Sequence, residues 1–420
     1  MYRPSGFPEY SPAEQAVFDR VKSIIEKHYA SFGYAHIYTP AVESNKILLA
    51  KSGNETTKQI FGLYGLAQGG EDLKDYSLHF DLTIPFARYI LDHEGEIAFP
   101  FKRFQIQPVR RGERAQRGRF RELWQCDIDS VWRTESKDSM IFYDAETLIV
   151  IANILDEIKK TYFSDKGITI HYNNRKLIEG LLADYTNKGE IFGLFDKYYK
   201  IGAEKFEEEL KSLTVNEDTQ RILEFVSDPK KYLSHSKSEE GIQQLLELEG
   251  YLEKLNTKGV KLVFDPFITR GLDYYTGTVY ETFLDDDMAL GSISSGGRYD
   301  GLTKYIDPKR SFSGVGGSIG ISRLMTLIFE QGEGSKQTTT NYLCIHFAET
   351  FSEIAKIADK LRSEGNNVEI YPVADKLGKQ FSYADKKNIV NVVILGTSER
   401  DAGIYKVKNL VQGTETEFPL

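Results

Sequence analysis

Apolar residues near the start of the chain recur every three or four positions from Val17 to Ile25, which predicts an amphipathic helix. The four residues from Ser11 to Glu14 form a capping box, with proline at the first helical position. We expect the helix to end near Gly33. A strand should follow it and stop at Pro40.

Alternating and β-branched segments then predict three strands, at 76–82, 101–109 and 122–131. The last two flank an arginine-rich segment, so they predict an antiparallel hairpin with a long basic loop. From 173 to 255 the pattern becomes helical and acidic, and strand patterns return at 261–264 and 278–280. A helix is expected at 321–329.

The last 80 residues alternate strand and helix after a polar linker at 331–340, which predicts a small α/β domain at 341–420. The expected division is therefore a first domain in two parts, 1–172 and 256–330, interrupted by the helical insertion 173–255. The fold class expected for the whole chain is α+β.

Composition is that of a folded, soluble protein: of 420 residues, 40% are hydrophobic and 27% are charged. No apolar segment approaches the roughly 20 residues that span a bilayer, and the first residues lack the apolar core of a signal peptide. Cys126 and Cys344 lie far apart and form no CxxC pair, which argues against a disulfide framework or a thiolate metal site. We expect a cytoplasmic protein.

The net charge of −9 argues against a protein that mainly neutralises phosphates, but the charge is unevenly placed. Between Lys102 and Arg121 there are eight basic residues and one acid, Glu113. This segment carries +7, so the rest of the chain carries −16.

The arginine-rich segment at 110–122 could be an ordinary solvated hairpin tip. Its charge comes from arginine, whose planar guanidinium suits bidentate contact with phosphate. The single acid within it could accept a hydrogen bond from an amine such as that of adenine. We therefore favour phosphate or nucleic-acid binding.

Three further segments are rich in glycine, tyrosine or arginine, at 269–281, 292–301 and 314–324. Paired glycines allow a backbone to approach a ligand closely, although a tight turn is the commoner cause. The segment 314–324 is no dinucleotide fingerprint, because Ile319 occupies the place of its third glycine. Patterns for a P-loop, a zinc site or a serine or cysteine nucleophile are absent from the sequence.

In this order, the segments resemble histidyl-tRNA synthetases, which are class II aminoacyl-tRNA synthetases. The first helix and strand resemble class motif 1, residues 102–131 motif 2, and 314–324 motif 3. Residues 270–277 (RGLDYYTG) and 295–301 (SGGRYDG) resemble the two histidine signatures, which are the more specific. Residues 377–387 resemble part of the family's anticodon-binding domain.

The resemblance implies an antiparallel-sheet catalytic domain, a helical insertion and an anticodon-binding domain. It also implies ATP as a substrate with Mg²⁺, L-histidine and tRNA(His) as partners, and a homodimer formed through motif 1. The activity would be ATP-dependent formation of histidyl-adenylate and transfer of histidine to the tRNA 3′ end. The insertion would contact the tRNA acceptor or play a structural part.

The resemblance also assigns residues to ATP. Arg111 and Arg270 would hold the α-phosphate, and Arg323 the γ-phosphate. Glu113 would accept the adenine amine, with Arg119 beside it in the ATP site. Together with Gln125, the arginines 111, 270 and 323 form the implied catalytic set.

For histidine, the resemblance places Asp81, Leu82, Thr83 and Gln125 at the α-amino group. Asp129 and Tyr275 would bond the imidazole ring, with Tyr274, Gly296 and Gly297 around it, and Arg111 and Arg270 would lie close to the amino acid.

Many bacterial members carry glutamate in place of Asp81 and Asp129, so this pocket looks more like the eukaryotic type. At the tip of the basic loop, we expect Arg114, Gln116 and Arg117 to touch the tRNA acceptor end.

Three alternatives differ in class. A non-catalytic relative, such as the regulatory subunit of ATP phosphoribosyltransferase, would bind histidine without activating it, but such relatives typically lose the ATP arginines and the C-terminal domain. A synthetase for another amino acid would lack the two histidine signatures. A plain nucleic-acid-binding module would explain the arginine loop alone.

Overall fold

A computed structural model describes residues 3–50, 57, 59–66, 75–136, 139–228, 238–255, 259–269, 275–334 and 338–420. The chain forms two compact units. The first comprises Met1–Pro8 and Val21–Gln331, and the second comprises Glu9–Arg20 and Gly332–Leu420.

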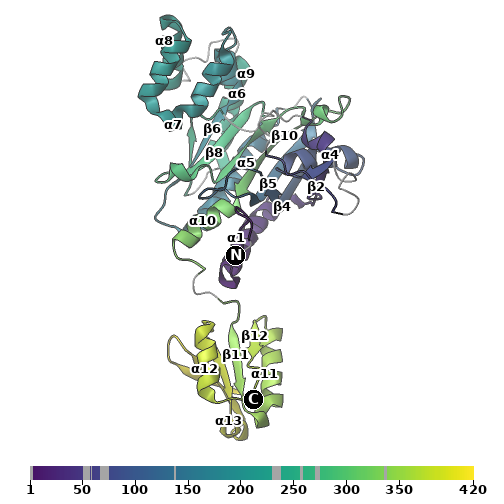
Figure 1. Cartoon of the computed structure of the whole chain (residues 1–420), viewed down its shortest axis with the longest axis vertical. Helices are drawn as coiled ribbons and strands as arrows, with labels where there is room; N and C mark the ends of the chain where they lie inside the picture. Colours follow the sequence, from purple (N-terminus) through teal and green to yellow (C-terminus); the bar gives the residue numbers. More distant parts are fainter. Residues whose placement is uncertain are drawn as a thin grey trace. The chain divides into compact units, whose positions relative to one another are not determined.

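An eight-stranded, mostly antiparallel sheet forms the first unit, in the order β1-β4-β5-β10-β9-β8-β6-β7 (Figure 1). Its only parallel pairs are β1 with β4 and β6 with β7. The strands are β1 (Ala35–His36), β4 (Phe101–Arg110), β5 (Glu122–Arg133), β6 (Ile168–Asn174), β7 (Lys261–Phe264), β8 (Thr278–Leu284), β9 (Ser294–Tyr299) and β10 (Phe312–Gly320). A short pair, β2 (Val42–Ser44) and β3 (Tyr76–Leu78), lies apart from this sheet. The predicted α+β class is confirmed.

The predicted hairpin is present, with β4 and β5 antiparallel from Phe101↔Val131 to Arg110↔Glu122. The first helix, α1 (Pro12–Ser31), also begins as predicted. The Ser11 amide donates to Glu14 Oε2 (2.7 Å) and the Glu14 amide donates to Ser11 Oγ (3.3 Å), which is the reciprocal bonding of a capping box.

Two predicted strands are shorter in the structure. The strand expected up to Pro40 is reduced to Ala35–His36, and the one expected at 76–82 ends at Leu78. Here the chain turns into α4 (Thr83–His93), whose early amide on Ile84 donates to Asp81 Oδ1 (3.3 Å). Asp81 therefore accepts from an amide of the first turn of α4 and lies outside the strand.

The central strands have one apolar and one polar face, because side chains alternate along each strand. Phe104, Ile106, Cys126, Ile128 and Val315 share the apolar face and are buried. Helix α5 (Ile141–Tyr162) packs on β10, and the Tyr29 hydroxyl of α1 donates to the Cys126 carbonyl (2.7 Å). These helices cover the apolar face, so the polar face is left for a site.

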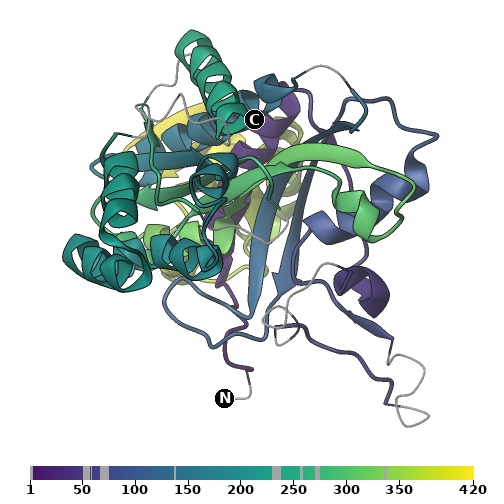
Figure 2. The same ribbon diagram turned by 90° about the horizontal axis from the view of Figure 1, so that it is seen from above.

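The described residues between β6 and β7 form the helices α6 (Arg175–Leu181), α7 (Lys188–Leu213), α8 (Asn216–Ser227) and α9 (Glu239–Leu255). Because β6 continues to Asn174, the helical segment begins two residues later than predicted. Helix α7 bends at Gly202, whose φ of 80° favours glycine. Seen from above, these teal helices lie on the opposite side of the sheet from α4 (Figure 2).

The second unit contains a five-stranded sheet in the order β12-β11-β13-β14-β15. Its strands are β11 (Tyr342–His346), β12 (Val368–Ile370), β13 (Asn391–Leu395), β14 (Ile404–Asn409) and β15 (Glu415–Pro419). Its helices are α11 (Phe351–Ser363), α12 (Leu377–Lys386) and the short α13 (Thr397–Asp401). Cys344 packs with α11 and its neighbour Leu343 with α12, so the two longer helices cover opposite faces. The predicted α/β domain is confirmed.

Among the described residues, the first unit also contains α2 (Asn45–Leu48) and α10 (Ile321–Glu330), the latter close to its predicted place. No helix among the described residues is long and apolar enough to cross a membrane.

Candidate active site

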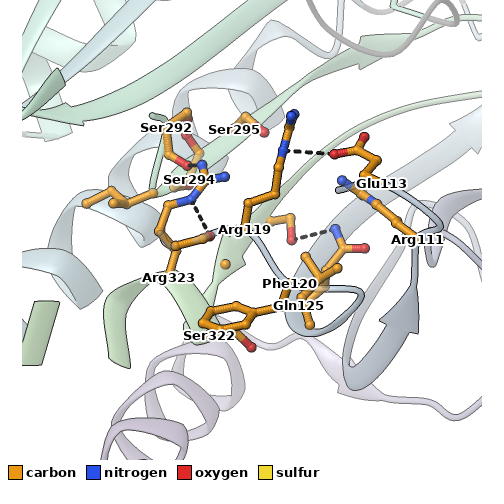
Figure 3. A pocket seen from close by; sticks show the side chains of 15 residues that line it. Arg111, Glu113, Arg119, Phe120, Gln125, Ser292, Ser294, Ser295, Ser322 and Arg323 are labelled. Atoms are coloured by element: carbon orange, nitrogen blue, oxygen red, sulfur yellow. Dashed lines mark hydrogen bonds and ion pairs between the residues drawn. The ribbon is translucent and has the colours of Figure 1, made fainter. Parts of the chain in front are cut away.

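A pocket opens beside the ends of β5 and β10, under the basic loop that joins β4 to β5 (Figure 3). Three arginines, one acid and one amide dominate its polar lining. These are Arg111, Glu113, Arg119 and Gln125 from the hairpin and Arg323 from the start of α10. Serines from β9, β10 and their flanks complete the wall: Ser292, Ser294, Ser295, Ser318 and Ser322.

Backbone carbonyls on two sides fix the position of Arg323. Its Nε donates to the Gly118 carbonyl (3.1 Å), and its Nη1 donates to the Ser292 carbonyl. Burial lowers the pKa of this guanidinium, and the neighbouring charges of Arg119 and Arg111 lower it further. Arg323 therefore lies in a region with an excess of positive charge.

The only acid lining this pocket among the described residues is Glu113, and its carboxylate pairs with Arg119 Nε (2.8 Å). Arg111 Nε donates instead to the Phe80 carbonyl (3.0 Å), which directs the side chain across the pocket floor. Figure 3 shows Glu113 and Arg111 on the wall opposite Arg323. With three guanidinium groups and one carboxylate, the pocket is suited to an anion.

Further along β5, beyond the residues that line this pocket, the polar face of the sheet becomes rich in hydrogen-bond acceptors. Gln125 Nε2 donates to Ser318 Oγ (3.2 Å), and Gln125 Oε1 is buried with no hydrogen-bond partner among the described residues. Gln125, Asp127 and Asp129 are spaced by two, so their side chains lie on the same face of the sheet.

Asp129 lies at the far end of this row in a network of buried charged and polar groups. Arg103 Nη2 lies 2.6 Å from Asp129 Oδ2, and the Tyr299 hydroxyl donates to Asp129 Oδ1 (2.7 Å). Arg103 is 0% exposed and also lies over the Phe86 ring, 4.3 Å from its centre. Burial raises the pKa of Asp129 to about 7, while Arg103 opposes the rise.

Asp81, Leu82 and Thr83 reach the same region from the start of α4, and Asp81 and Leu82 are buried. Burial raises the pKa of Asp81 to about 7, whereas the Ile84 amide and the charge of Arg111 lower it. Asp127 raises that pKa as well, so the two acids lie within electrostatic range of each other.

The paired glycines lie in strands at the centre of the sheet. From the sequence, a tight turn was the commoner reason for such a pair. Gly296 and Gly297 belong to β9, and Gly316 and Gly317 pair with them on β10. A Cβ on Gly316 would overlap the Asp129 carboxylate. The other three have the same restriction. A Cβ on Gly296 would collide with the Gly316 carbonyl, one on Gly297 with the Thr278 carbonyl, and one on Gly317 with the Tyr280 hydroxyl. These glycines are required by close packing on both faces.

The histidyl-tRNA synthetase family model matches residues 6–324, and an anticodon-binding-domain model matches residues 340–420. The chain belongs to the histidyl-tRNA synthetase family. It is 38% identical to the histidine–tRNA ligase of Clostridium tetani, over 99% of this chain and 95% of that protein. It is also 38% identical to the histidine–tRNA ligase of Stenotrophomonas maltophilia, over 99% of this chain and 94% of that protein.

Solved structures agree with this assignment. The crystal structure of histidyl-tRNA synthetase from Nostoc sp. PCC 7120 covers 100% of this chain, with a TM-score of 0.86 and 33% identity. At 20% identity, a Bacillus halodurans structure titled as an ATP phosphoribosyltransferase regulatory subunit/histidyl-tRNA synthetase shares the fold, with a TM-score of 0.74.

The structure therefore gathers Arg111, Glu113, Arg119, Gln125 and Arg323 in one pocket. Asp129 and the segment 81–83 lie on the adjoining part of the same sheet face. Tyr275 is half-buried and its ring lies beside Gly297. It packs against two hydrophobic clusters, one that contains Phe80 and one that contains Val279. Arg270 and Tyr274 lie outside the described residues.

At the tip of the basic loop, Arg114, Gln116 and Arg117 are exposed, as expected for residues that meet a large partner. Arg117 already has partners within the chain. Its Nη2 lies 2.7 Å from Glu330 Oε2 at the end of α10 and 2.9 Å from Asp287 Oδ2.

The family resemblance assigned no function to four residues that shape the site: Arg103, Asp127, Tyr299 and Ser318. Arg103 was counted only as part of a basic segment, although it is buried beside Asp129. The signal was the alternation of β4, because Arg103 lies opposite Asp129 once the hairpin register is set. Tyr299 and Ser318 come from distant strands, and their positions depend on the sheet order.

Proposed function

We propose that this pocket binds ATP through its arginines and activates L-histidine for transfer to tRNA(His). The chain is a histidine–tRNA ligase, as its family is. One observation carries the assignment of the pocket: Arg111, Arg119 and Arg323 converge on the same space. Among the described residues that line it, the only acid is Glu113. Such a cluster needs a polyanion such as a triphosphate.

In the first step, the histidine carboxylate attacks the α-phosphate of ATP and pyrophosphate leaves. Both reactants are negative, and charge builds up on the phosphate oxygens in the transition state. Guanidinium groups that are already held in place stabilise this charge without reorganising. Arg323 is held by two carbonyls and Arg111 by one, so both meet this requirement.

Alignment of the two substrates supplies much of the remaining rate enhancement, on the order of 7 kcal/mol or more by effective-molarity arguments. The reaction requires no protein nucleophile, and both cysteines are buried free thiols. We assign Mg²⁺ to the bound ATP, because no group of three metal-ligating side chains occurs in the described part of the chain.

For histidine, we propose that Asp129 accepts the imidazole N–H, with Tyr275 at the ring. The support is that Asp129 is oriented on one oxygen by Arg103 and on the other by Tyr299. A pocket built on hydrogen bonds to a two-nitrogen ring rejects isosteres without them by roughly 10⁴-fold or more. Asp81, Thr83 and Gln125 would hold the α-amino group.

We also propose a homodimer in the cytoplasm. Tyr38, Tyr64 and Leu66 are large apolar side chains that are well exposed, and they lie in or after the segment that resembles motif 1. The dimer rests on the resemblance to motif 1, because Tyr38 belongs to that segment whereas Tyr64 and Leu66 lie well beyond it. The two free thiols fit a reducing compartment.

A regulatory, non-catalytic function is the second candidate, since the Bacillus halodurans structure shares the fold. Retention of Arg111, Arg119 and Arg323 in one pocket, together with the anticodon-binding domain, favours the enzyme.

ATP–pyrophosphate exchange measured with each of the twenty amino acids tests the assignment. We expect exchange with histidine alone, and Arg323→Ala should lower its kcat by about 10²- to 10³-fold. Arg310→Ala is the matched control, because Arg310 bonds Asp307 and the Leu91 carbonyl outside the pocket. Absence of exchange with histidine, or a wild-type rate in Arg323→Ala, would contradict the proposal.

A further inference from the structure

Asp127 is a buried acid on the polar face that the functional assignments above leave unused. It is 4% exposed and lies between Gln125 and Asp129 on β5. Its Oδ1 has no hydrogen-bond partner among the described residues. The Ser318 hydroxyl bonds this carboxyl group, and Ser318 itself lines the pocket. An unpartnered oxygen at this depth is costly unless a ligand supplies a donor.

The neighbouring acceptors point to a cationic donor. Gln125 Oε1 is also buried and without a partner among the described residues. Ser318 bonds both side chains, yet one oxygen of each stays without a partner among the described residues. Two such acceptors on adjacent same-face positions match an ammonium group, which has three N–H bonds to give.

The charge count agrees with an ammonium. Asp81, Asp127 and Asp129 are all buried on this side of the pocket, and the buried cation among them is Arg103. Arg103 lies against Asp129, and Asp127 forms no ion pair with a described residue. Burial raises the pKa of Asp127, and only the charges of Arg103 and Arg111 and the bond from Ser318 oppose it.

The position of Asp127 along the strand selects which part of the substrate it meets. From Gln125 to Asp129 the strand spans about 13 Å, with Asp127 at the midpoint. The phosphate-binding arginines lie at the Gln125 end, and the proposed imidazole acceptor is at the other. Histidine laid between them places its α-carbon and ammonium over the middle of this interval.

We propose that Asp127 is a substrate-binding residue that binds the α-ammonium group of histidine together with Gln125. This inference rests on the proposed function, because it takes the direction of the substrate from the roles of the arginines and Asp129. Asp127 supplies the formal negative charge for the ammonium, and Gln125 supplies a neutral acceptor beside it.

Two inhibitors separate this function from a structural one. Histidinol keeps the ammonium and lacks the carboxylate, whereas 3-(imidazol-4-yl)propionate lacks the ammonium. In wild-type enzyme, we expect histidinol to inhibit exchange at least about 30-fold more tightly, since charge-assisted hydrogen bonds are lost with the other compound.

In Asp127→Asn, this preference should fall by about tenfold or more, and the KM for histidine should rise similarly, with the KM for ATP within about twofold of wild type. Asp127→Ser serves as a second variant with a smaller side chain. Asp265→Asn is the matched control: Asp265 is equally buried but bonds His171 and Tyr199 at the end of β7. Its inhibitor preference should stay at the wild-type value.

The possible failures differ from one another. If wild-type enzyme does not exchange with histidine, the proposed function is wrong. If it exchanges and prefers histidinol, but the Asp127 variants keep the full preference, only the function of Asp127 is wrong. A variant whose unfolding temperature falls and whose inhibitor preference is unchanged would show that Asp127 is purely structural.

Discussion

At the scale of single residues, the site is a sheet face on which acids outnumber cations. Asp81, Asp127 and Asp129 are buried together near one buried guanidinium, Arg103. A buried carboxylate without a full complement of donors is destabilising, and its pKa rises in response. The free protein therefore stores unfavourable electrostatic energy in the place where a cationic substrate group is expected to bind.

The affinity for histidine should consequently depend on pH near neutrality. Burial raises the pKa values of Asp81 and Asp129 to about 7, so both lose charge as the pH falls below 7. We expect the KM for histidine in exchange to rise by up to about tenfold per pH unit below 7, and the KM for ATP to change less.

Free histidine also titrates in this range, so the decisive comparison is with Asp81→Asn. That variant removes one titrating group from the enzyme and leaves the substrate unchanged, and its KM should rise less steeply. An identical slope in both enzymes would show that the substrate alone titrates.

The same shifts give the opposite trend for stability. A carboxyl group whose folded-state pKa exceeds its unfolded value near 3.8 binds protons more readily when folded. Its contribution to stability is fully present below that unfolded value and is lost as the pH rises through about 7. Thermal unfolding of the free protein should show this trend, and Asp81→Asn should weaken it.

The sequence predicted a subset of these residues. Arg111, Glu113, Gln125 and Arg323 were predicted from the resemblance, and they do line one pocket. Asp127 and Tyr299 carried no such signal, because their partners Ser318 and Asp129 lie on other strands. Contacts of this kind depend on sheet order, which periodicity within one segment does not contain.

At the scale of elements, the hairpin of β4 and β5 carries most of the site. Its strands, and the helix starting at Pro12, were predictable because each depends on local alternation or local capping. The strands expected to reach Pro40 and Leu82 end earlier, at His36 and Leu78. After Leu78 the chain turns into α4, whose Ile84 amide bonds Asp81. Glycine-rich β9 and β10 lacked strand signals, since their positions are set by neighbouring side chains.

The basic loop should affect transfer to tRNA more than activation of histidine. Arg117 at its tip pairs with Glu330 and Asp287, so this side chain must exchange partners if it is to meet a phosphate. We expect Arg117→Ala to raise the KM for tRNA about three- to tenfold, with ATP–pyrophosphate exchange unchanged.

Glu330→Gln should have the opposite sign, lowering that KM slightly, because one partner no longer competes for the guanidinium. Lys160→Ala is a matched control, since Lys160 is exposed and forms an ion pair with Asp156 on α5, away from the basic loop. Unchanged charging by Arg117→Ala would rule out a contact between Arg117 and the acceptor end.

At the scale of the whole molecule, charge placement matters more than the net charge of −9. The segment from Lys102 to Arg121 carries +7, yet five of its eight basic residues form ion pairs within the chain. Arg111, Arg114 and Arg121 are those with no ion pair among the described residues. The cationic field offered to a nucleic acid is thus weaker than the sequence suggests.

This neutralisation predicts a shallow salt dependence for tRNA charging. Because Arg111 is assigned to ATP, Arg114 and Arg121 are left, and two phosphate contacts correspond to a slope of about −1 to −2 for log kcat/KM for tRNA against log salt concentration. The last 80 residues carry 10 basic and 11 acidic side chains, so they should add little. Exchange of histidine and ATP, measured over the same salt range, provides the control, and a slope steeper than about −5 would refute this expectation.

The four glycines at the centre of the sheet limit how the enzyme could be redesigned. No side chain of β9 or β10 stands at Gly296, Gly297, Gly316 or Gly317, and none can be added without displacing Asp129, Tyr280 or the backbone. A designer who wants the pocket to accept an unnatural ring therefore cannot gain or lose a side chain at these four positions. New amino-acid preferences would have to come from the side chains that already face the site, such as Ser318 on β10, Tyr299 on β9 and the polar row on β5.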